Sequence, residues 1–209
     1  MVVNKKYIHI GKGAKIHKGA IIGYKTLRKV KSLDLKIGQN LVVMAGAVIY
    51  AGTSIRDGAV ISHNSIVREE NRIGDNFCLW NNSIVDYGCK IGDKVKIHCN
   101  VYVAQYTKIE DDVFIGPGTT IANDLHPKCK YSRRCMRGPH IKRGAIIGAG
   151  ATINPFVLIG ERAFIGAGSV VTKDIPSGKV VCGNPAKIIC SIKDLKCRTG
   201  LTDFPYMSK

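Results

Sequence analysis

Aromatic residues and long apolar runs are scarce in this sequence. Aromatic residues make up only 7% of the 209 residues, whereas hydrophobic residues as a whole make up 45%. The chain must therefore build an aliphatic core, and its hydrophobic content is too high for a disordered chain. No stretch reaches the roughly 18 consecutive apolar residues of a membrane helix. The first residues, MVVNKKYIHIGKG, contain no apolar segment of signal-peptide length. We therefore expect a cytoplasmic protein.

Closely spaced cysteines and acidic residues are also scarce. None of the eight cysteines forms a C-x-x-C pair, which disfavours a zinc ribbon or a thioredoxin-type site and predicts free thiols in a reducing compartment. The 15 acidic residues are outnumbered by 32 lysines and arginines, so the formal net charge is +17. This charge favours an anionic partner, whether nucleic acid, a membrane surface or a phosphorylated small molecule.

What the sequence does contain is a period of six. Every sixth residue of Ile37–Ile121 is aliphatic, and the same period resumes over Ile141–Val171. A weaker copy precedes it at Ile10, Ile16 and Ile22. The fifth position of each hexad is small or aliphatic except at Asn71 and Phe77, and glycine often follows the aliphatic position.

A period of six is not helical, because an α-helix would scatter every sixth residue around its axis. It fits a short strand followed by a turn, with two side chains of each hexad facing inward. Three such units close a triangular coil, and stacked coils lie about 4.8 Å apart, the hydrogen-bonding distance within a sheet. The sequence therefore predicts an all-β, parallel β-helix of about eight coils.

This pattern resembles the hexapeptide-repeat left-handed β-helix superfamily over about residues 8–190. The left-handed sense of the coil is implied by the resemblance, since general crossover rules favour the opposite hand. We expect a β-helix domain over residues 1–190, with an extruded loop at about residues 123–140, and a short C-terminal cap over residues 191–209.

Two segments interrupt the repeat. Residues 23–36 have no evident role, whereas the loop at about 123–140 and the two residues after Ile141 are strongly basic. Long loops on rigid scaffolds often carry function, so this one is either a clamp for phosphate groups or a solvated basic loop. No aromatic stacking platform supports a nucleic-acid interface. The basic residues are Lys128, Lys130, Arg133, Arg134, Arg137, Lys142 and Arg143.

The C-terminal coils resemble those of CoA-dependent acyltransferases of this superfamily. The resemblance is carried by the runs Ile165–Asp174 and Gly183–Lys187. It implies acetyl-CoA as the cosubstrate, lying between the subunits of a homotrimer, with no metal. The pantetheine arm would contact small residues and exposed backbone, and lysines would offset the phosphate charge near the adenine. The implied contacts are Gly148, Ala149, Gly166 and Ala167 for the arm, and Lys173, Pro185 and Lys187 for the nucleotide.

The middle of the chain is similar to nucleotide-sugar N-acyltransferases, which act on the amine of a UDP- or dTDP-linked deoxysugar. The similar segments are 98–101 (HCNV), 110–117 (EDDVFIGP) and 123–127 (NDLHP). The similarity implies a role in polysaccharide biosynthesis. It also implies a substrate site, which we assign to Glu110, Asn123, Asp124, His126 and Arg134. The closest sugar enzymes usually carry amides where this chain has His98 and Cys99.

The expected reaction is direct attack of a sugar amine on the thioester in a ternary complex. A neutral amine needs positioning, a proton acceptor and an oxyanion donor. We assign the acceptor to His98, whose ordinary pKa is near neutral, although this histidine could instead only contact the substrate. Asn100 would orient the amine, Asp124 and His126 would touch the sugar or assist the base, and a backbone N–H at Gly148 or Ala149 would bind the oxyanion.

Three other functions compete with this prediction. One is O-acetylation of a sugar or of serine, and another is a non-enzymatic basic scaffold for nucleic acid or membrane. The third is a γ-type carbonic anhydrase, which needs histidines in register, whereas His63 and His98 are 35 residues apart and not a multiple of 18. We expect neither nucleic acid nor membrane as a partner. The sugar, the position of its amine, UDP or dTDP, and acetyl or a longer acyl group stay open.

Overall fold

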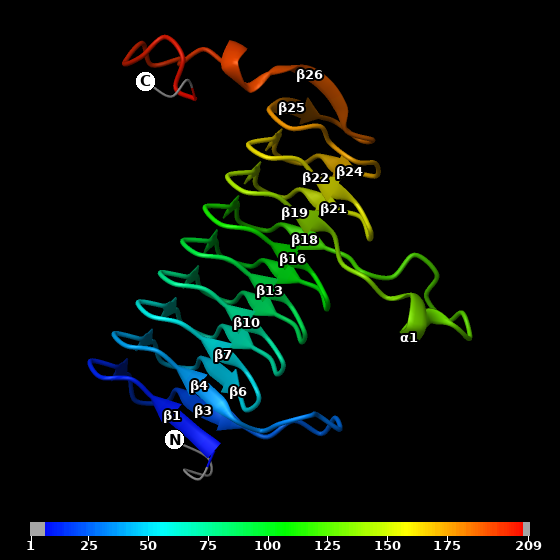
Figure 1. The fold of residues 1–209 in the computed structure, drawn as a ribbon. Helices are drawn as coiled ribbons and strands as arrows, with labels where there is room; N and C mark the ends of the chain where they lie inside the picture. The colour runs from blue at the N-terminus through cyan, green and yellow to red at the C-terminus, as the bar shows by residue number, and fades with distance from the viewer. Residues whose placement is uncertain (1–6, 207–209) are drawn as a thin grey trace.

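A computed structural model describes residues 7–206 as a three-sided column of stacked coils (Figure 1). Each side is one sheet, and we name the sides face 1, face 2 and face 3 in the order in which the chain crosses them. All strand pairs among the described residues are parallel except the last, β25 with β26. The chain is therefore the parallel β-helix that the period of six predicts, with the left-handed sense that the family resemblance implies.

The strands are two to five residues long, and each face stacks one strand per coil. Face 1 contains β1 (Ile8–Ile10), β4 (Leu35–Ile37), β7 (Ser54–Ile55), β10 (Arg72–Ile73), β13 (Lys90–Ile91), β16 (Lys108–Ile109), β19 (His140–Ile141) and β22 (Leu158–Ile159). Face 2 contains β2 (Lys15–Ile16), β5 (Val42–Val43), β8 (Val60–Ile61), β11 (Cys78–Leu79), β14 (Lys96–Ile97), β17 (Phe114–Ile115), β20 (Ile146–Ile147), β23 (Phe164–Ile165), β25 (Lys179–Cys182) and β26 (Lys187–Ser191). Face 3 contains β3 (Ile21–Tyr24), β6 (Val48–Tyr50), β9 (Ile66–Val67), β12 (Ile84–Val85), β15 (Tyr102–Val103), β18 (Thr120–Ile121), β21 (Thr152–Ile153) and β24 (Val170–Val171).

The strict register explains why the repeat is so regular. Ile73 pairs with Ile55 in the coil before it and with Ile91 in the coil after it, so identical hexad positions stack in columns. The second residue of nearly every strand is buried, while the first points outward. The two exceptions to the small-residue rule are also buried: Phe77 fills the core, and the side chain of Asn71 hydrogen-bonds Arg68 O and Cys89 N–H.

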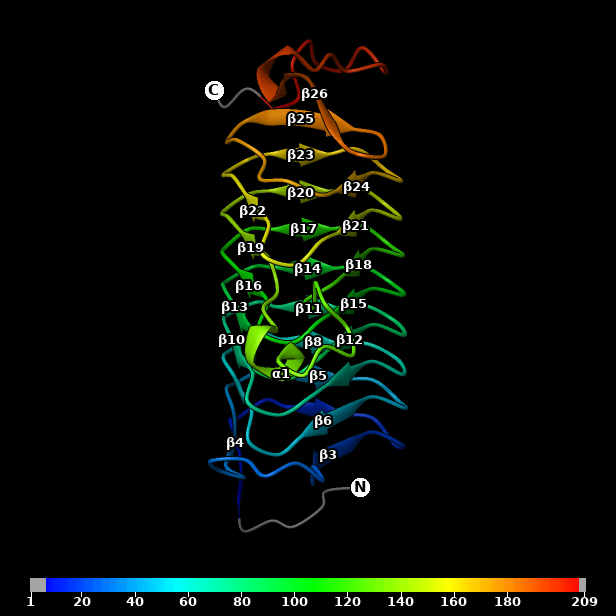
Figure 2. The ribbon, with the colours of Figure 1, turned by 90° about the vertical axis from the view of Figure 1, so that its right-hand side faces the viewer.

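Two excursions leave the column, both at the edge where face 3 turns into face 1, the 3/1 edge (Figure 2). The first runs over residues 25–34, because β3 extends to Tyr24 and β4 begins at Leu35. The second, the extruded loop, runs over residues 122–139 and contains α1 (Ser132–Cys135). At the C-terminus the β25–β26 hairpin and a 3-10 turn at Ile192–Asp194 close the column. Within residues 7–206 no helix is long and apolar enough to cross a membrane.

Candidate functional site

The edge where face 2 turns into face 3, the 2/3 edge, is built of backbone in its last coils. Gly116, Gly148 and Gly166 directly follow β17, β20 and β23. A Cβ on Gly148 would lie 2.5 Å from the backbone N of Ala167, and one on Gly116 would lie 2.7 Å from the backbone N of Ala149. Only glycine therefore allows these turns to stack so closely.

The outer part of these turns is open. A Cβ on Gly150 or Gly168 would meet no atom within 4 Å, and the neighbouring Ala149 and Ala167 are exposed. We call residues 116–118, 148–150 and 166–168 the glycine shelf. Among residues 7–206, no acceptor takes the amide N–H groups of Ala149 and Ala167. The shelf thus offers free backbone donors about 4.8 Å apart, the spacing of adjacent coils.

His98 lies at the N-terminal end of the shelf. Its backbone N–H donates to Ile115 O, so it sits one coil before Gly116 and two coils before Gly148. Its ring lies between Trp80, 3.8 Å away between centroids, and Phe114, 5.2 Å away. No side chain among residues 7–206 hydrogen-bonds its ring nitrogens. The predicted base is therefore held by stacking and has no orienting carboxylate.

Asn100, the second predicted catalytic residue, belongs to the same edge. Its φ is 58°, in the left-handed region. Asn64 and Asn82, at the same turn position of the two preceding coils, also have a positive φ. Asparagine is one of the few residues that enter this conformation readily. The turn alone accounts for the residue type, so its orienting role stays a prediction.

The predicted loop residues lie at the 3/1 edge. Asp124 accepts hydrogen bonds from the Ser132 hydroxyl and from His126 N–H at 2.9 Å. The Ser132 and His126 bonds hold the pKa of Asp124 below its ordinary value. His126 and Arg134 are exposed, whereas Asn123 is buried and donates to Gln105 Oε1 at 2.6 Å. These residues leave the column at a different edge from His98, so one chain does not bring the two groups together.

Glu110 belongs to a third place, an ion cluster on face 1. Its Oε1 lies 2.8 Å from His140 Nε2, 3.1 Å from Lys142 Nζ and 3.7 Å from Lys108 Nζ. Burial acts to raise the pKa of Glu110, but the hydrogen bonds from Lys142 and His140 outweigh it and lower the value to about 2. Burial, with the nearby lysines, lowers the pKa of His140. Glu110 is thus already paired with basic side chains of its own chain.

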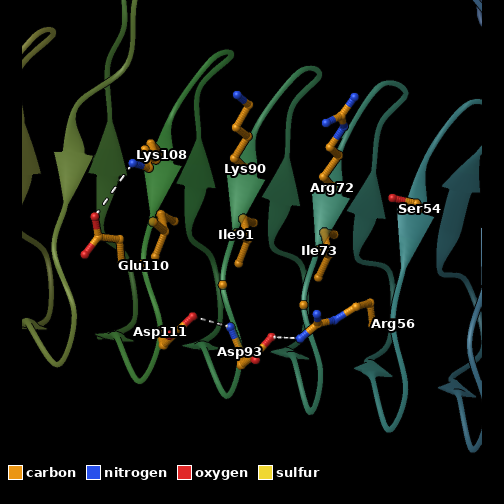
Figure 3. Close-up of a pocket in the computed structure, with 13 residues that line it drawn as sticks. Ser54, Arg56, Arg72, Ile73, Lys90, Ile91, Asp93, Lys108, Glu110 and Asp111 are labelled. Carbon is orange, nitrogen blue, oxygen red and sulfur yellow. Dashed lines mark hydrogen bonds and ion pairs between the residues drawn. The ribbon is translucent and has the colours of Figure 1, made fainter.

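An open groove runs along face 1 beside this cluster (Figure 3). Lys108, Lys90 and Arg72 stand on successive strands above it. Below them a column of aspartates at positions 57, 75, 93 and 111 accepts backbone N–H groups of the preceding coil. Arg56 pairs with Asp75 at 2.6 Å and also with Asp93. The charges of this groove are therefore largely balanced within the chain.

The residues assigned to the cofactor divide between the edges. Gly148, Ala149, Gly166 and Ala167 belong to the glycine shelf. Pro185 lies two residues after Gly183, whose backbone O accepts a hydrogen bond from Val170 N–H. Lys187 pairs with Cys182 in the terminal hairpin, one coil beyond Gly166. Lys173 follows β24 and so lies towards the 3/1 edge. Within residues 7–206, no three His, Cys, Asp or Glu side chains are grouped so that they could hold a metal ion.

Two features of these edges were missed from sequence. One is the stacking of Trp80 and Phe114 on His98, and the other is Tyr106, which stands at a left-handed turn position of the 3/1 edge with φ of 60°. In steps of 18 this turn position reads Gly52, Glu70, Gly88 and Tyr106, and an aromatic residue at a left-handed turn position is unusual.

Family models match most of the repeat. The model of the bacterial transferase hexapeptide (six repeats) matches residues 88–123 and 138–173. The model of the hexapeptide repeat of succinyl-transferase matches residues 35–68 and 70–105. The matched residues end and resume on either side of the extruded loop.

Several known proteins are similar to the chain. A hexapeptide-repeat acetyltransferase from Vibrio cholerae, solved in complex with acetyl-CoA, is 31% identical with a TM-score of 0.52, and the match covers 60% of this chain and 72% of that one. A serine acetyltransferase of Buchnera aphidicola is 36% identical over 113 residues, 49% of this chain and 40% of the relative. A 2,3,4,5-tetrahydropyridine-2,6-dicarboxylate N-acetyltransferase of Clostridium perfringens is 40% identical over 92 residues, 44% of this chain and 36% of the relative. The chain thus spans less than half the length of these two curated relatives.

Proposed function

The chain belongs to the hexapeptide-repeat acyltransferase superfamily, and we propose that it transfers an acetyl group from acetyl-CoA to the amine of a nucleotide-linked amino-deoxysugar. The acetyl-CoA-bound relative from Vibrio cholerae supports the donor. The similarity of the segments 98–101, 110–117 and 123–127 to nucleotide-sugar N-acyltransferases supports the acceptor.

The observation that carries the proposal is the glycine shelf, which leads along one edge to His98. Its small residues leave room for an extended thiol arm against the backbone, and the free N–H groups of Ala149 and Ala167 can pair with amide or thioester carbonyls. Two coils separate Gly148 from His98, about 10 Å at the ordinary spacing of strands. The reacting carbonyl, held by the Ala149 N–H, and the attacking amine would lie between these two coils, with the His98 side chain reaching towards the amine.

In the proposed reaction the neutral amine attacks the thioester carbonyl, and a C–N bond forms. The negative charge that develops on the carbonyl oxygen is stabilised by the Ala149 N–H. His98 accepts the proton from the attacking nitrogen, the C–S bond breaks, and the thiolate takes that proton as it leaves. No covalent acyl-enzyme is required, because a neutral amine is already a good nucleophile.

The surroundings of His98 favour an amine over a hydroxyl. Activating a hydroxyl usually requires a base that a third group orients, as in nucleophilic triads. Within residues 7–206, the His98 ring contacts the aromatic rings of Trp80 and Phe114, and no carboxylate hydrogen-bonds it. The similarity to a serine acetyltransferase supports O-acetylation of serine or of a sugar as the second candidate.

A homotrimer would complete the site. His98 and the shelf lie at the 2/3 edge, while Asp124, His126 and Arg134 leave at the 3/1 edge of the same chain. A threefold arrangement of columns can set the loop of one subunit against the shelf of the next. Sedimentation should give a trimer, and a monomer with full transferase activity would contradict the shared site.

The test is thiol release from acetyl-CoA in the presence of UDP- and dTDP-linked amino sugars, with serine and hydroxyl-only sugars as parallel acceptors. We expect turnover with at least one nucleotide-linked amine and background rates with the same sugar lacking the amine. Turnover with serine or hydroxyl sugars alone would replace the proposal by the second candidate. Background rates with every acceptor would contradict both the proposed N-acetylation and the O-acetylation that is the second candidate.

His98→Asn should lower kcat at least tenfold, because the proton acceptor is lost. His63→Asn is the matched control, since His63 stands exposed on the same edge two coils earlier. Wild-type turnover in His98→Asn would show that another group accepts the proton.

A further inference from the structure

The two excursions of the 3/1 edge enclose a cavity between them. Arg28 comes from the first excursion, Arg133 and Met136 come from the extruded loop, and Tyr87 and Tyr106 come from turns of the column. The cavity has a volume of about 400 Å³, within the range of small-molecule sites. It lies on a different edge from the glycine shelf.

Arg28 is a fixed wall of this cavity. Its Nη1 donates to Glu69 Oε1 at 2.8 Å and to Glu70 Oε2 at 3.3 Å, and its guanidinium lies 3.4 Å from the centroid of the Tyr87 ring. Glu69 is fully buried and also accepts from the Thr26 hydroxyl at 3.0 Å. The carboxylates balance the charge of Arg28, so its role here is to hold the excursion and Tyr87 in place.

The extruded loop is tied to the same network at its base. Asn123 donates to Gln105 Oε1, and Gln105 in turn donates to Asp86. Asp86 is also paired with Arg68 at 3.1 Å and accepts the Tyr102 hydroxyl at 2.8 Å. Arg68 reaches Glu69 at 3.0 Å. A continuous chain of hydrogen bonds therefore joins the two walls, so the cavity is organised before any ligand enters.

Tyr106 presents an aromatic ring to the cavity, packed edge-on against the Tyr87 ring with 5.5 Å between centroids. Its φ of 60° is in the left-handed region, which costs a bulky residue roughly 1–2 kcal/mol. Its ring lies over Gly88, where a Cβ would be 2.9 Å from the ring atoms, and remains 44% exposed. The other aromatic residue with positive φ is Phe156, in the first turn of this edge after the loop. Glycine or asparagine would fill such a turn at lower cost, so the half-exposed tyrosine ring points to a role outside the turn.

Arg133 brings to the cavity a positive charge that no carboxylate neutralises among the described residues. It belongs to α1 and is exposed, and no carboxylate among residues 7–206 pairs with it. No acidic residue lines the cavity. A ligand that satisfies this lining must therefore carry a negative group for the Arg133 guanidinium and a flat ring for Tyr106.

We propose that this cavity binds a nucleoside phosphate, with the base against Tyr106 and a phosphate on Arg133. The inference deepens the proposed function, on which the assignment to the acceptor's UDP or dTDP group rests. The same chemistry is present in the nucleotide of CoA, so the experiment must separate the two sources.

The experiment is calorimetric titration of the full chain with UDP, dTDP, CoA, uridine and inorganic pyrophosphate. We expect UDP or dTDP to bind more tightly than uridine or pyrophosphate. Arg133→Ala and Tyr106→Asn should each weaken that binding at least tenfold. Asparagine tolerates positive φ, so Tyr106→Asn should fold and melt no lower than wild type. Phe156→Asn, at the same turn position beyond the loop, and Arg198→Ala, at an exposed arginine of the C-terminal segment, are the matched controls and should bind as wild type does.

Equal nucleotide binding by wild type and Arg133→Ala would overturn the inference, and so would pyrophosphate binding as tightly as UDP. Loss of CoA binding alone in the variants would assign the cavity to the donor and overturn the acceptor assignment. Nucleotide binding that the variants weaken, without acetylation of any amino sugar, would leave the inference standing while the proposed function fails. If Arg133→Ala and Tyr106→Asn both acetylate an amino sugar with an unchanged KM for that acceptor, the proposed function stands and the inference fails.

Discussion

The 2/3 edge and the 3/1 edge are made from the same hexads, yet they expose different chemistry. At the 2/3 edge the last coils keep the shortest possible turn, and glycine and alanine leave the backbone uncovered. At the 3/1 edge the chain twice departs from the column (Figure 2). Side chains from both departures line one cavity over the turns. A repeat can therefore serve function either by removing side chains from its turns or by inserting segments between its coils.

The physical cost differs between the two edges. A short glycine turn is supported by close contact with the coils above and below it, so a substitution there acts on the stability of the stack. An excursion must be held by its own interactions, here the buried Glu69 and the chain of polar side chains that ends at Asn123. Substitutions can test each edge separately.

The largest expected effect is on stability at the 2/3 edge. Gly148→Ala should lower the free energy of unfolding by about 3 kcal/mol, because its Cβ would lie 2.5 Å from a backbone nitrogen. Gly118→Asn is the control, since its nearest neighbour atom is 3.9 Å away and its φ of 69° suits asparagine. It should change stability by less than about 0.5 kcal/mol in urea unfolding. Equal losses in both variants would show that the stacking contacts do not decide which glycines are essential.

The next effect is on activity at the same edge. Ala167→Phe should lower kcat/KM for acetyl-CoA about a hundredfold, because a large side chain would cover the glycine shelf at an exposed position. Its melting temperature should stay at the wild-type value. Ala45→Phe places the same bulk at the same turn position of the second coil, far from the shelf, and should retain activity. Normal activity in Ala167→Phe would mean that the thioester approaches elsewhere.

A smaller effect is expected at the 3/1 edge. Glu69→Gln should destabilise the protein by about 2 kcal/mol, because two arginines and Thr26 lose a buried carboxylate. It should also speed proteolysis within residues 25–34. Glu70→Gln is the control and should cost less, because Glu70 is partly exposed and its Oε2 lies 3.3 Å from Arg28 Nη1, farther than the carboxylate of Glu69. A loss in Glu70→Gln as large as that in Glu69→Gln would place the anchor of the excursion outside the buried network.

The smallest effect is expected on face 1, away from both the glycine turns and the excursions. The folded pKa of Glu110 is about 2, below its ordinary value of 4.5. A depressed carboxyl pKa stabilises the fold above the unfolded pKa, so this stability is lost as the pH falls from about 4.5 towards 2. Glu110→Gln should therefore be about 1 kcal/mol less stable than wild type at pH 6, and the difference in melting temperature should shrink through that window. A difference that does not change with pH would contradict the ion cluster.

The period of six predicted the fold well, and the structure confirms the three faces and the stacked coils. The exceptions at Asn71 and Phe77 could also be accommodated, because both side chains point inward and are satisfied there. The candidate site stays a prediction. His98 belongs to the 2/3 edge, whereas Asp124 and His126 belong to the 3/1 edge of the same chain, so only an assembly of several chains could bring them together.

By itself the sequence determined the coil, because inward burial depends only on a residue's place in its hexad and repeats in every coil. It also predicted the turn glycines, since glycine directly follows the aliphatic position of the hexad at Gly116, Gly148 and Gly166. Only the tertiary structure decided that Arg28 and Arg133 face one cavity. Both belong to segments without a period, and their meeting depends on how two independent excursions fold back on the same edge.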